Sequence, residues 1–331
     1  MPNGIVLFAK EPGPTSFSAI GSVKRALKTT KVGHTGTLDS FAQGLLVVCV
    51  GSLTKLAGNI TAFDKSYKAV LKFGEETDTL EYTGNVIKTA PLPTREALEE
   101  AVKAFTGPIM QRPPLFSAIH VDGKRASDLA REGKSQELPA RPVTVFKAEI
   151  EDLLLTADGL VEYALIDFSV SKGTYIRSLA RDIAEHCGSA GHLTGLYRTK
   201  VGNFNIEDSA AFSSLKEFTI DNAIATAKEF TEKPYEGRKD TEELHQDIQN
   251  HLLDFTKPAA ELCGFKTVNI VDQAAEKDFQ NGKKLLSRMF TKPLHEFETD
   301  TQIAVFNIEE KFIGLIYRDY EGRISYKFVL N

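Results

Sequence analysis

One short glycine-rich segment of the chain combines a carboxylate with a histidine. Asp39 and His34 lie within residues 33–44, which hold three glycines and lead directly into the apolar run of residues 45–50. Loops of this kind commonly present side chains for binding or catalysis, and glycines let a ligand approach the backbone closely. Taken alone, the segment is more typical of a tight turn, in which Asp39 caps a helical turn and His34 fills a gap.

Three further residues could act together with Asp39. Tyr67 lies in a stretch of alternating polarity, and Tyr175 and Arg177 share the sequence KGTYIR at residues 172–177. An arginine beside an aspartate keeps the carboxylate ionised even where a bulky substrate excludes water, and tyrosine rings offer a surface for an unstacked base. The set suits chemistry on a flipped nucleobase, done by a carboxylate without metal or cofactor. Composition alone also allows a structural alternative, in which the aspartate and the arginine form an unrelated surface ion pair and the two tyrosines lie in the core.

Other chemistries find little support in the sequence. Residues 44–51 are followed by Ser52 rather than by lysine, so they are not a Walker loop; no GxGxxG motif follows a strand, and no serine lies in a GxSxG motif. The seven histidines lack metal-ligand spacing, and the three cysteines lack a CxxC pair, which favours a reducing cytoplasm over a structural zinc site. We also find no membrane-spanning stretch or signal peptide. We therefore expect a cytoplasmic protein without metal, cofactor or membrane segment.

Charge is unevenly spread along the 331 residues. The formal net charge of −5 argues mildly against nucleic-acid binding, but residues 1–60 hold six basic and two acidic side chains, a net of +4. Residues 211–260 hold six basic and ten acidic side chains, a net of −4. Such differences also arise by chance, yet they allow a basic face near the glycine-rich segment.

Hydrophobic periodicity predicts the elements that must position these residues. Residues 5–8 predict a strand, after which Thr15 or Ser16 can cap a helix. The inward face of that helix is expected to hold Phe17, Ile20, Val23 and Leu27. Further predicted elements are the strand 67–73, the helices 94–105, 127–132 and 176–187, and a hairpin formed by residues 143–154 and 160–169. Because strands and helices mix without regular βαβ alternation, we predict an α+β fold with a largely antiparallel mixed sheet and flanking helices.

The chain length predicts two domains, because single hydrophobic cores stop growing near about 250–300 residues. Residues 1–260 are expected to form the catalytic domain, in which residues 213–260 make an acidic helical extension. A linker is expected near residues 258–264. Residues 265–331 hold several short strands separated by turn signals, which predicts a small β-barrel-like domain.

The glycine-rich segment also resembles a known motif. Residues 33–39, GHTGTLD, with Ala42, Gly44, Leu45 and Leu46 after them, resemble the catalytic motif of the tRNA pseudouridine-55 synthases, the TruB family. The C-terminal strands resemble the small PUA domain that often follows in this family. Further blocks resemble the same family in the same order, namely residues 10–16, 65–84, 111–133, 172–179 and 192–198.

The resemblance implies catalytic roles for three residues. Asp39 matches the catalytic aspartate, which acts at the ribose while the uracil is detached, turned and rejoined through carbon 5. Tyr67 matches the tyrosine that stacks on the flipped base and assists proton loss at carbon 5. Arg177 matches the arginine that pairs with the aspartate. The first step is either attack of Asp39 on carbon 1 of the ribose or removal of a proton from carbon 2 of the ribose, and the sequence is compatible with both.

Five positions match substrate-binding residues of the family. His34 matches a histidine that fills the space left by the flipped nucleotide. Tyr175 and Leu196 match positions that line the uracil pocket. Lys10 and Arg198 match basic positions near the RNA. The residues alone also allow Leu196 to be an ordinary core residue and Lys10 to be a solvated lysine on the surface.

We therefore expect a cofactor-free, monomeric tRNA pseudouridine synthase that acts on uridine 55 in the T arm. The alternative is a catalytically idle RNA-binding or tRNA-chaperone protein on the same scaffold. A different base-modifying or glycosidic enzyme is disfavoured, because no second carboxylate is evident beside Asp39.

Overall fold

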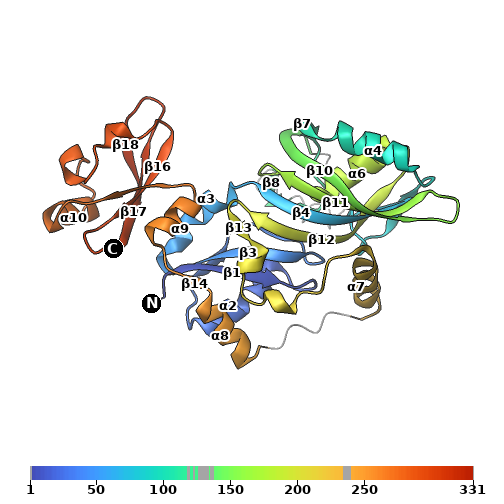
Figure 1. Ribbon diagram of the computed structural model, residues 1–331, viewed down its shortest axis with the longest axis horizontal. Coiled ribbons are helices and arrows are strands. Elements are labelled where there is room, and N and C mark those ends of the chain that lie inside the picture. Colours follow the sequence, from blue (N-terminus) through green and yellow to red (C-terminus); the bar gives the residue numbers. More distant parts are fainter. Residues whose placement is uncertain are drawn as a thin grey trace.

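A ten-stranded sheet runs through the larger part of the molecule, in the order β14-β1-β3-β12-β4-β11-β10-β7, with β2 beside β3 and β13 beside β12 (Figure 1). The computed structural model describes residues 2–117, 120–121, 124–125, 134, 138–233 and 240–330. All pairings of this sheet are antiparallel except that of β12 with β3. The predicted α+β fold with a largely antiparallel mixed sheet is thus confirmed. The strands are β1 (Gly4–Lys10), β2 (Val32–His34), β3 (Gln43–Val50), β4 (Lys65–Phe73), β7 (Gly107–Gln111), β10 (Arg141–Leu155), β11 (Val161–Val170), β12 (Gly191–Val201), β13 (Phe204–Asn205) and β14 (Leu252–Leu253).

The parallel contact between β3 and β12 joins the two halves of the sheet. It pairs Gln43 with Tyr197 and Gly44 with Arg198. Gly44 has a φ of 121°, and a Cβ at this position would lie 2.3 Å from the carbonyl oxygen of Arg198. Only glycine fits there. Gly44 therefore lets β12 approach the end of the glycine-rich segment, rather than leaving room for a ligand.

Two helices cover the half of the sheet that contains β4 and β10. The helix α6 (Ile176–His186) packs on β12 and β4, and α4 (Arg95–Ala104) packs against α6 and β10. Thr94 caps α4 by accepting a hydrogen bond from the backbone nitrogen of Ala97, as its position in the sequence predicts. The predicted hairpin is also confirmed, since β10 and β11 are antiparallel neighbours.

The acidic extension is helical, as predicted, and forms α7 (Ile220–Glu232), α8 (Glu242–Asn250) and α9 (Lys257–Leu262). The helix α7 packs on β12, and α8 packs on α2 (Gly21–Ala26). An ion pair between Asp240 and Arg25 accompanies the second contact. In addition, Gln249 Nε2 donates a hydrogen bond to the carbonyl oxygen of Ala26 at 2.9 Å. Part of the basic N-terminal region is therefore neutralised by the chain's own acidic extension.

The first helical region differs from its prediction at Phe17. Two short helices, α1 (Ser16–Ala19) and α2, replace one continuous helix, and Ile20 is the C-cap of the first and the N-cap of the second. Ile20, Val23 and Leu27 are buried as expected, but the side chain of Phe17 is 71% exposed. The reason is that the hydroxyl of Ser16 hydrogen-bonds the backbone of Leu38, which turns Ser16 inward and the next residue outward.

The C-terminal domain is a four-stranded sheet in the order β15-β16-β17-β18, with α10 (Gln273–Gln280) beside it (Figure 1). The expected small β domain is present, as an open sheet whose strands are β15 (Lys266–Asn269), β16 (Thr301–Phe306), β17 (Phe312–Arg318) and β18 (Ile324–Val329). The expected linker at residues 258–264 is wrong: this stretch is mostly α9, whose Ala260 is fully buried. Phe306 of β16 and Phe8 of β1 belong to one hydrophobic core, so the two domains are packed together.

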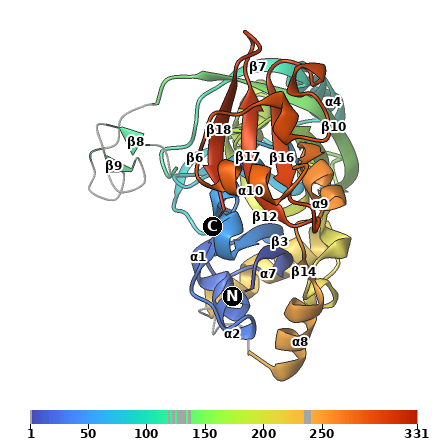
Figure 2. The ribbon, with the colours of Figure 1, turned by 90° about the vertical axis from the view of Figure 1, so that its left-hand side faces the viewer.

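Several smaller elements complete the chain. Figure 2, in which the C-terminal domain faces the viewer, labels β6, β8 and β9 among them. The predicted helix at residues 127–132 lies outside the described residues. Across the part of the chain that the structure describes, no helix has both the length and the apolar composition needed to cross a membrane. The smaller elements are η1 (Gly51–Leu56), α3 (Ala57–Thr61), β5 (Glu75–Thr77), β6 (Val86–Thr89), β8 (His120–Val121), β9 (Lys124–Arg125), η2 (Ile206–Asp208), η3 (Phe212–Ser214), η4 (Ser287–Met289) and η5 (Leu294–Glu296).

Candidate active site

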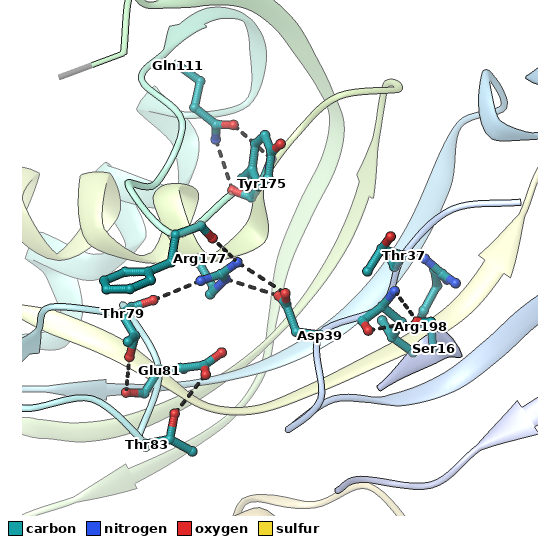
Figure 3. Close-up of polar contacts among 12 residues, drawn as sticks. Ser16, Thr37, Asp39, Thr79, Glu81, Thr83, Gln111, Tyr175, Arg177 and Arg198 are labelled. Carbon is teal, nitrogen blue, oxygen red and sulfur yellow. Dashed lines mark hydrogen bonds and ion pairs between the residues drawn. The ribbon is translucent and has the colours of Figure 1, made fainter. Parts of the chain in front are cut away.

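Asp39 lies in the loop between β2 and β3, and its carboxylate meets the guanidinium of Arg177 (Figure 3). Arg177 Nη2 donates to Asp39 Oδ1 at 3.1 Å, and Arg177 Nε lies 3.0 Å from Asp39 Oδ2. The arginine side chain is 7% exposed and the aspartate side chain 33% exposed. The aspartate is therefore the member of the pair that a substrate can reach. The structure brings these two predicted catalytic residues together.

Arg177 is held in place by backbone groups as well. Its Nη1 donates to the carbonyl oxygen of Thr79 at 3.0 Å, and its Nη2 donates to that of Phe116 at 2.9 Å (Figure 3). Gln111 fixes the start of α6, because its side chain donates to Tyr175 O at 3.1 Å and accepts from Tyr175 N at 2.8 Å. The guanidinium thus has a fixed position before any substrate binds, as a preorganised site requires.

Lys10 does not lie on the surface. Its exposure is 0%, and its Nζ donates to three carbonyl oxygens, at 2.6 Å from Ala42, 3.2 Å from Ser40 and 3.0 Å from Glu11. Burial lowers the pKa of Lys10 to about 7, and the nearby charge of Asp39 opposes this shift. The alternative that Lys10 is a solvated lysine on the surface is therefore wrong. Its ammonium group instead holds the backbone that follows Asp39.

Arg198 supports the other side of the same loop. It is 2% exposed, and its guanidinium donates to Leu45 O at 2.8 Å and to Thr37 O and Gly36 O, both at 3.2 Å. Lys10 and Arg198 therefore donate hydrogen bonds to carbonyl groups on both sides of Asp39. Without these donors, burying the carbonyl groups would be costly. The resemblance implies that Lys10 and Arg198 lie near the RNA. In the structure their charged groups bind carbonyl oxygens of the loop and are not exposed to a phosphate.

His34 lies on β2 at the opposite end of the loop and is paired with Val48 of β3. Its Nδ1 is buried without a hydrogen-bond partner among the described residues. Burial, followed by the charge of Arg198, lowers the pKa of His34, so its ring is neutral at neutral pH. A half-buried neutral ring with one unsatisfied nitrogen is suited to contact another ring or a polar edge of a nucleotide.

Three further predicted site residues, Tyr67, Leu196 and Tyr175, come from different elements near Asp39 and Arg177. Tyr67 of β4 is 9% exposed and Leu196 of β12 is 5% exposed. Both belong to the hydrophobic cluster that contains Phe41 of the loop that carries Asp39 (residues 35–42, called the catalytic loop). Tyr175 directly precedes α6, and burial raises the pKa of its hydroxyl. The structure therefore places an apolar, aromatic wall beside a carboxylate, which is the composition that a flipped base needs.

Glu81 is a second carboxylate at the site, and sequence reasoning missed it. Figure 3 shows its side chain extending toward the pair of Asp39 and Arg177. Burial, followed by the negative charge of Asp39, raises the pKa of Glu81 to about 7, whereas Arg177 and a 2.7 Å hydrogen bond from the Thr83 hydroxyl act in the opposite direction. The expectation that no second carboxylate lies beside Asp39 is therefore wrong.

The loop that carries Glu81 is tied to the sheet by backbone bonds. Leu193 N donates to Leu80 O at 3.1 Å, and Tyr82 N donates to Leu193 O at 3.0 Å. Leu80 adopts a φ of 60°, which is strained for a leucine and is maintained by these bonds and by its burial. One signal for Glu81 was available, since it lies between Thr79 and Gly84 within a block that resembles the TruB family.

Within the described ranges of the chain, no group of three or more histidine, cysteine, aspartate or glutamate side chains is arranged to hold a metal ion. The groups that Asp39, Glu81, Arg177, Tyr67 and Tyr175 carry are carboxylates, a guanidinium and tyrosine hydroxyls.

Comparison with known proteins identifies the family. The family model described as TruB family pseudouridylate synthase (N terminal domain) matches residues 24–176. The tRNA pseudouridine synthase B of Treponema denticola is 39% identical over 325 residues, which cover 92% of this chain and 90% of that protein. The protein of the same name from Borreliella burgdorferi is 43% identical over 221 residues, covering 66% and 77% of the two chains.

Solved structures support the same fold. A chain in an H/ACA RNP bound to a substrate RNA containing 2'-deoxyuridine has a TM-score of 0.64 at 19% identity and covers 99% of this chain and 85% of that one. A chain in a Cbf5-Nop10-Gar1 complex has a TM-score of 0.63 at 23% identity, covering 98% and 84%. These likenesses concern the fold alone. The sequence relatives show that the chain belongs to the TruB family of pseudouridine synthases, which are isomerases that modify tRNA.

Proposed function

We propose that the protein converts uridine 55 in the T arm of tRNA to pseudouridine, with Asp39 as the group that acts on the ribose. The observation that carries this proposal is the contact of Asp39 with the buried guanidinium of Arg177. An adjacent guanidinium balances the charge of the carboxylate and fixes the direction of its oxygens. Asp39 is half-buried at the edge of an aromatic wall, where a base turned out of its stack can be held against it.

The reaction is an isomerisation, so every atom of the uridine except exchangeable hydrogen stays in the product. The bond between carbon 1 of the ribose and nitrogen 1 of uracil breaks, the ring turns, and carbon 5 bonds to carbon 1. The hydrogen on carbon 5 leaves as a proton, and nitrogen 1 gains one. Asp39 can begin this sequence by attacking carbon 1 of the ribose or by removing a proton from carbon 2 of the ribose.

The remaining site residues have supporting roles in this proposal. Tyr67 stacks on the flipped uracil and assists the loss of the proton from carbon 5. Tyr175 and Leu196 line the pocket that holds the ring. His34 fills the space that the flipped nucleotide leaves in the RNA, a role that suits its half-buried and neutral ring. Lys10 and Arg198 keep the loop of Asp39 in shape through its carbonyl groups.

Two further expectations accompany the function. We place the protein in the cytoplasm, where its tRNA substrate is found, and we expect it to act as a monomer. Light scattering on a purified sample tests the second point, and a stable dimer at micromolar concentration would contradict it.

The function is tested by incubating unmodified tRNA with the protein and mapping pseudouridine along the whole RNA. The expected result is modification at uridine 55 and none in a control tRNA that carries cytidine at this position. If tRNA binds but no pseudouridine forms anywhere, the idle RNA-binding alternative replaces the proposal. If pseudouridine forms only at another position, the assignment to the T arm is wrong while the activity stands.

A further inference from the structure

Phe17 is an exposed aromatic ring carried on a segment that is bonded to the catalytic loop. The Ser16 hydroxyl accepts from Leu38 N at 2.8 Å and donates to Leu38 O at 2.9 Å, and Gly13 N donates to Ser40 O at 2.7 Å. These bonds reach the neighbours of Asp39 on both sides. Phe17 follows directly after Ser16 and is 71% exposed. The backbone that carries this exposed ring is therefore held beside the catalytic loop.

A lysine covers this ring. Lys24 Nζ lies 4.7 Å from the centroid of the Phe17 ring, which is a cation–π distance. Among the described residues, no carboxylate lies within ion-pair distance of Lys24, whereas the neighbouring Arg25 is paired with Asp240. The acidic extension thus neutralises Arg25 of α2. Lys24, beside Phe17, forms no ion pair with a described carboxylate.

The buried cations near the active site cannot provide phosphate contacts. Lys10 and Arg198 are 0% and 2% exposed, and their donors are directed at carbonyl groups of the chain. An RNA strand beside Asp39 must therefore be neutralised by exposed cations. An exposed aromatic ring with an ammonium group next to it provides the two contacts that unpaired nucleotides make, which are base stacking and phosphate neutralisation.

A single exposed phenylalanine is common on protein surfaces and by itself indicates nothing. Here two observations coincide, namely the anchoring of α1 to the catalytic loop and the position of Lys24 over the ring, where no described carboxylate pairs with it. Charge complementarity favours an anionic occupant, and the continuity of this surface with the proposed RNA site favours RNA over an acidic protein surface.

We propose that Phe17 and Lys24 form a contact site for unpaired nucleotides of the T loop beside the flipped uridine, in which the ring stacks on a base and the ammonium neutralises a phosphate. This inference rests on the proposed function, since it needs an RNA strand at the catalytic loop. It assigns no chemical step to either residue. Both act on the affinity for the substrate.

The test measures the affinity for an unmodified T-arm hairpin and for full-length tRNA, together with the single-turnover rate at saturating RNA. Phe17→Ala is expected to weaken binding about tenfold and Phe17→Tyr to restore it, because stacking needs only an aromatic face. Lys24→Gln is expected to weaken binding and to reduce the slope of log affinity against log salt by about 0.7–0.9. The saturated rate and the thermal midpoint should stay at the wild-type values.

Two matched controls address general effects of the substitutions. Phe146→Ala removes another exposed ring, 53% exposed, on β10 near the other edge of the sheet. Lys103→Gln removes an exposed lysine of α4. Both control variants should bind tRNA like the wild type.

Unchanged affinity in both Phe17→Ala and Lys24→Gln would overturn the inference and would leave a protein partner as the reason for the exposed ring. Equal losses in the control variants would also overturn it. In each case wild-type pseudouridine formation is measured in parallel. A wild type that modifies tRNA while Phe17→Ala binds normally refutes this inference alone, whereas an inactive wild type refutes the proposed function.

Discussion

The guanidinium of Arg177 contacts both carboxylate oxygens of Asp39, at 3.1 Å from Oδ1 and 3.0 Å from Oδ2, and links the first turn of α6 to the loop between β2 and β3. The same guanidinium also donates to two backbone carbonyl groups, those of Thr79 and Phe116. A single side chain therefore organises three separate segments around the carboxylate of Asp39.

Arg177→Lys tests this organising role. A lysine keeps the charge but cannot make the forked contacts with the carboxylate and the carbonyls. We expect the single-turnover rate at saturating tRNA to fall on the order of 100-fold, since each hydrogen bond to a charged group contributes about 1.5–3 kcal/mol. The affinity for tRNA should change little. A rate within twofold of the wild type would show that the fork is dispensable.

Tyr67→Phe separates stacking from proton transfer. The variant keeps the ring that is proposed to stack on the uracil and loses only the hydroxyl. We expect tRNA binding to stay nearly intact and turnover to slow by on the order of 100-fold, the usual effect of removing a general acid or base. A quench-flow measurement of pseudouridine formation checks the rate. A large loss of affinity with unchanged turnover would contradict the assigned role.

Lys10→Met tests whether Lys10 supports the loop or binds phosphate. Methionine has a similar length but cannot donate to the carbonyl groups of Ala42 and Ser40. The turnover rate should fall because the loop of Asp39 loses its support, while the salt dependence of tRNA binding should equal that of the wild type. A slope of log affinity against log salt lowered by about 0.7–0.9 would instead identify a phosphate contact.

Glu81→Gln tests the raised pKa of Glu81 through stability. Because the pKa of about 7 in the folded protein exceeds the ordinary value of 4.5, the folded state binds the proton more tightly than the unfolded state. The stabilising contribution of the protonated carboxyl is complete below pH 4.5 and is lost as the pH rises through 7.

Glutamine stays neutral at every pH, so the free energy of unfolding of Glu81→Gln minus that of the wild type should grow between about pH 5 and 8, by up to about 3 kcal/mol. Urea unfolding at several pH values measures this difference. A difference that is independent of pH would show that Glu81 has an ordinary pKa.

The sequence predicts much of the fold and of the catalytic pair. Alternation in β4 and helical spacing in α6 are local signals, and they placed Tyr67 and Arg177 on the correct elements. The partnership of Arg177 with Asp39, which are 138 residues apart, came from the resemblance to a family and not from spacing.

Other features depend on long-range contacts that local patterns do not encode. The apolar spacing predicts a buried face for Phe17, but the bonds between Ser16 and Leu38 set the orientation of the helix. The resemblance implies a position near the RNA for Lys10 and leaves a solvated surface position open, because lysines rarely are fully buried. The carbonyl partners of Lys10 come together only when β1 meets the catalytic loop. Glu81 reaches the site because its loop is bonded to β12.

The central claim is that the carboxylate of Asp39 performs the chemistry, and Asp39→Asn tests it most directly. Asparagine keeps the shape of the side chain and removes its charge. In a single-turnover reaction with saturating unmodified tRNA, we predict that the wild type forms pseudouridine at position 55, whereas Asp39→Asn binds the tRNA with an affinity within a few-fold of the wild type and forms none. Pseudouridine formation by Asp39→Asn at the wild-type rate would contradict the account.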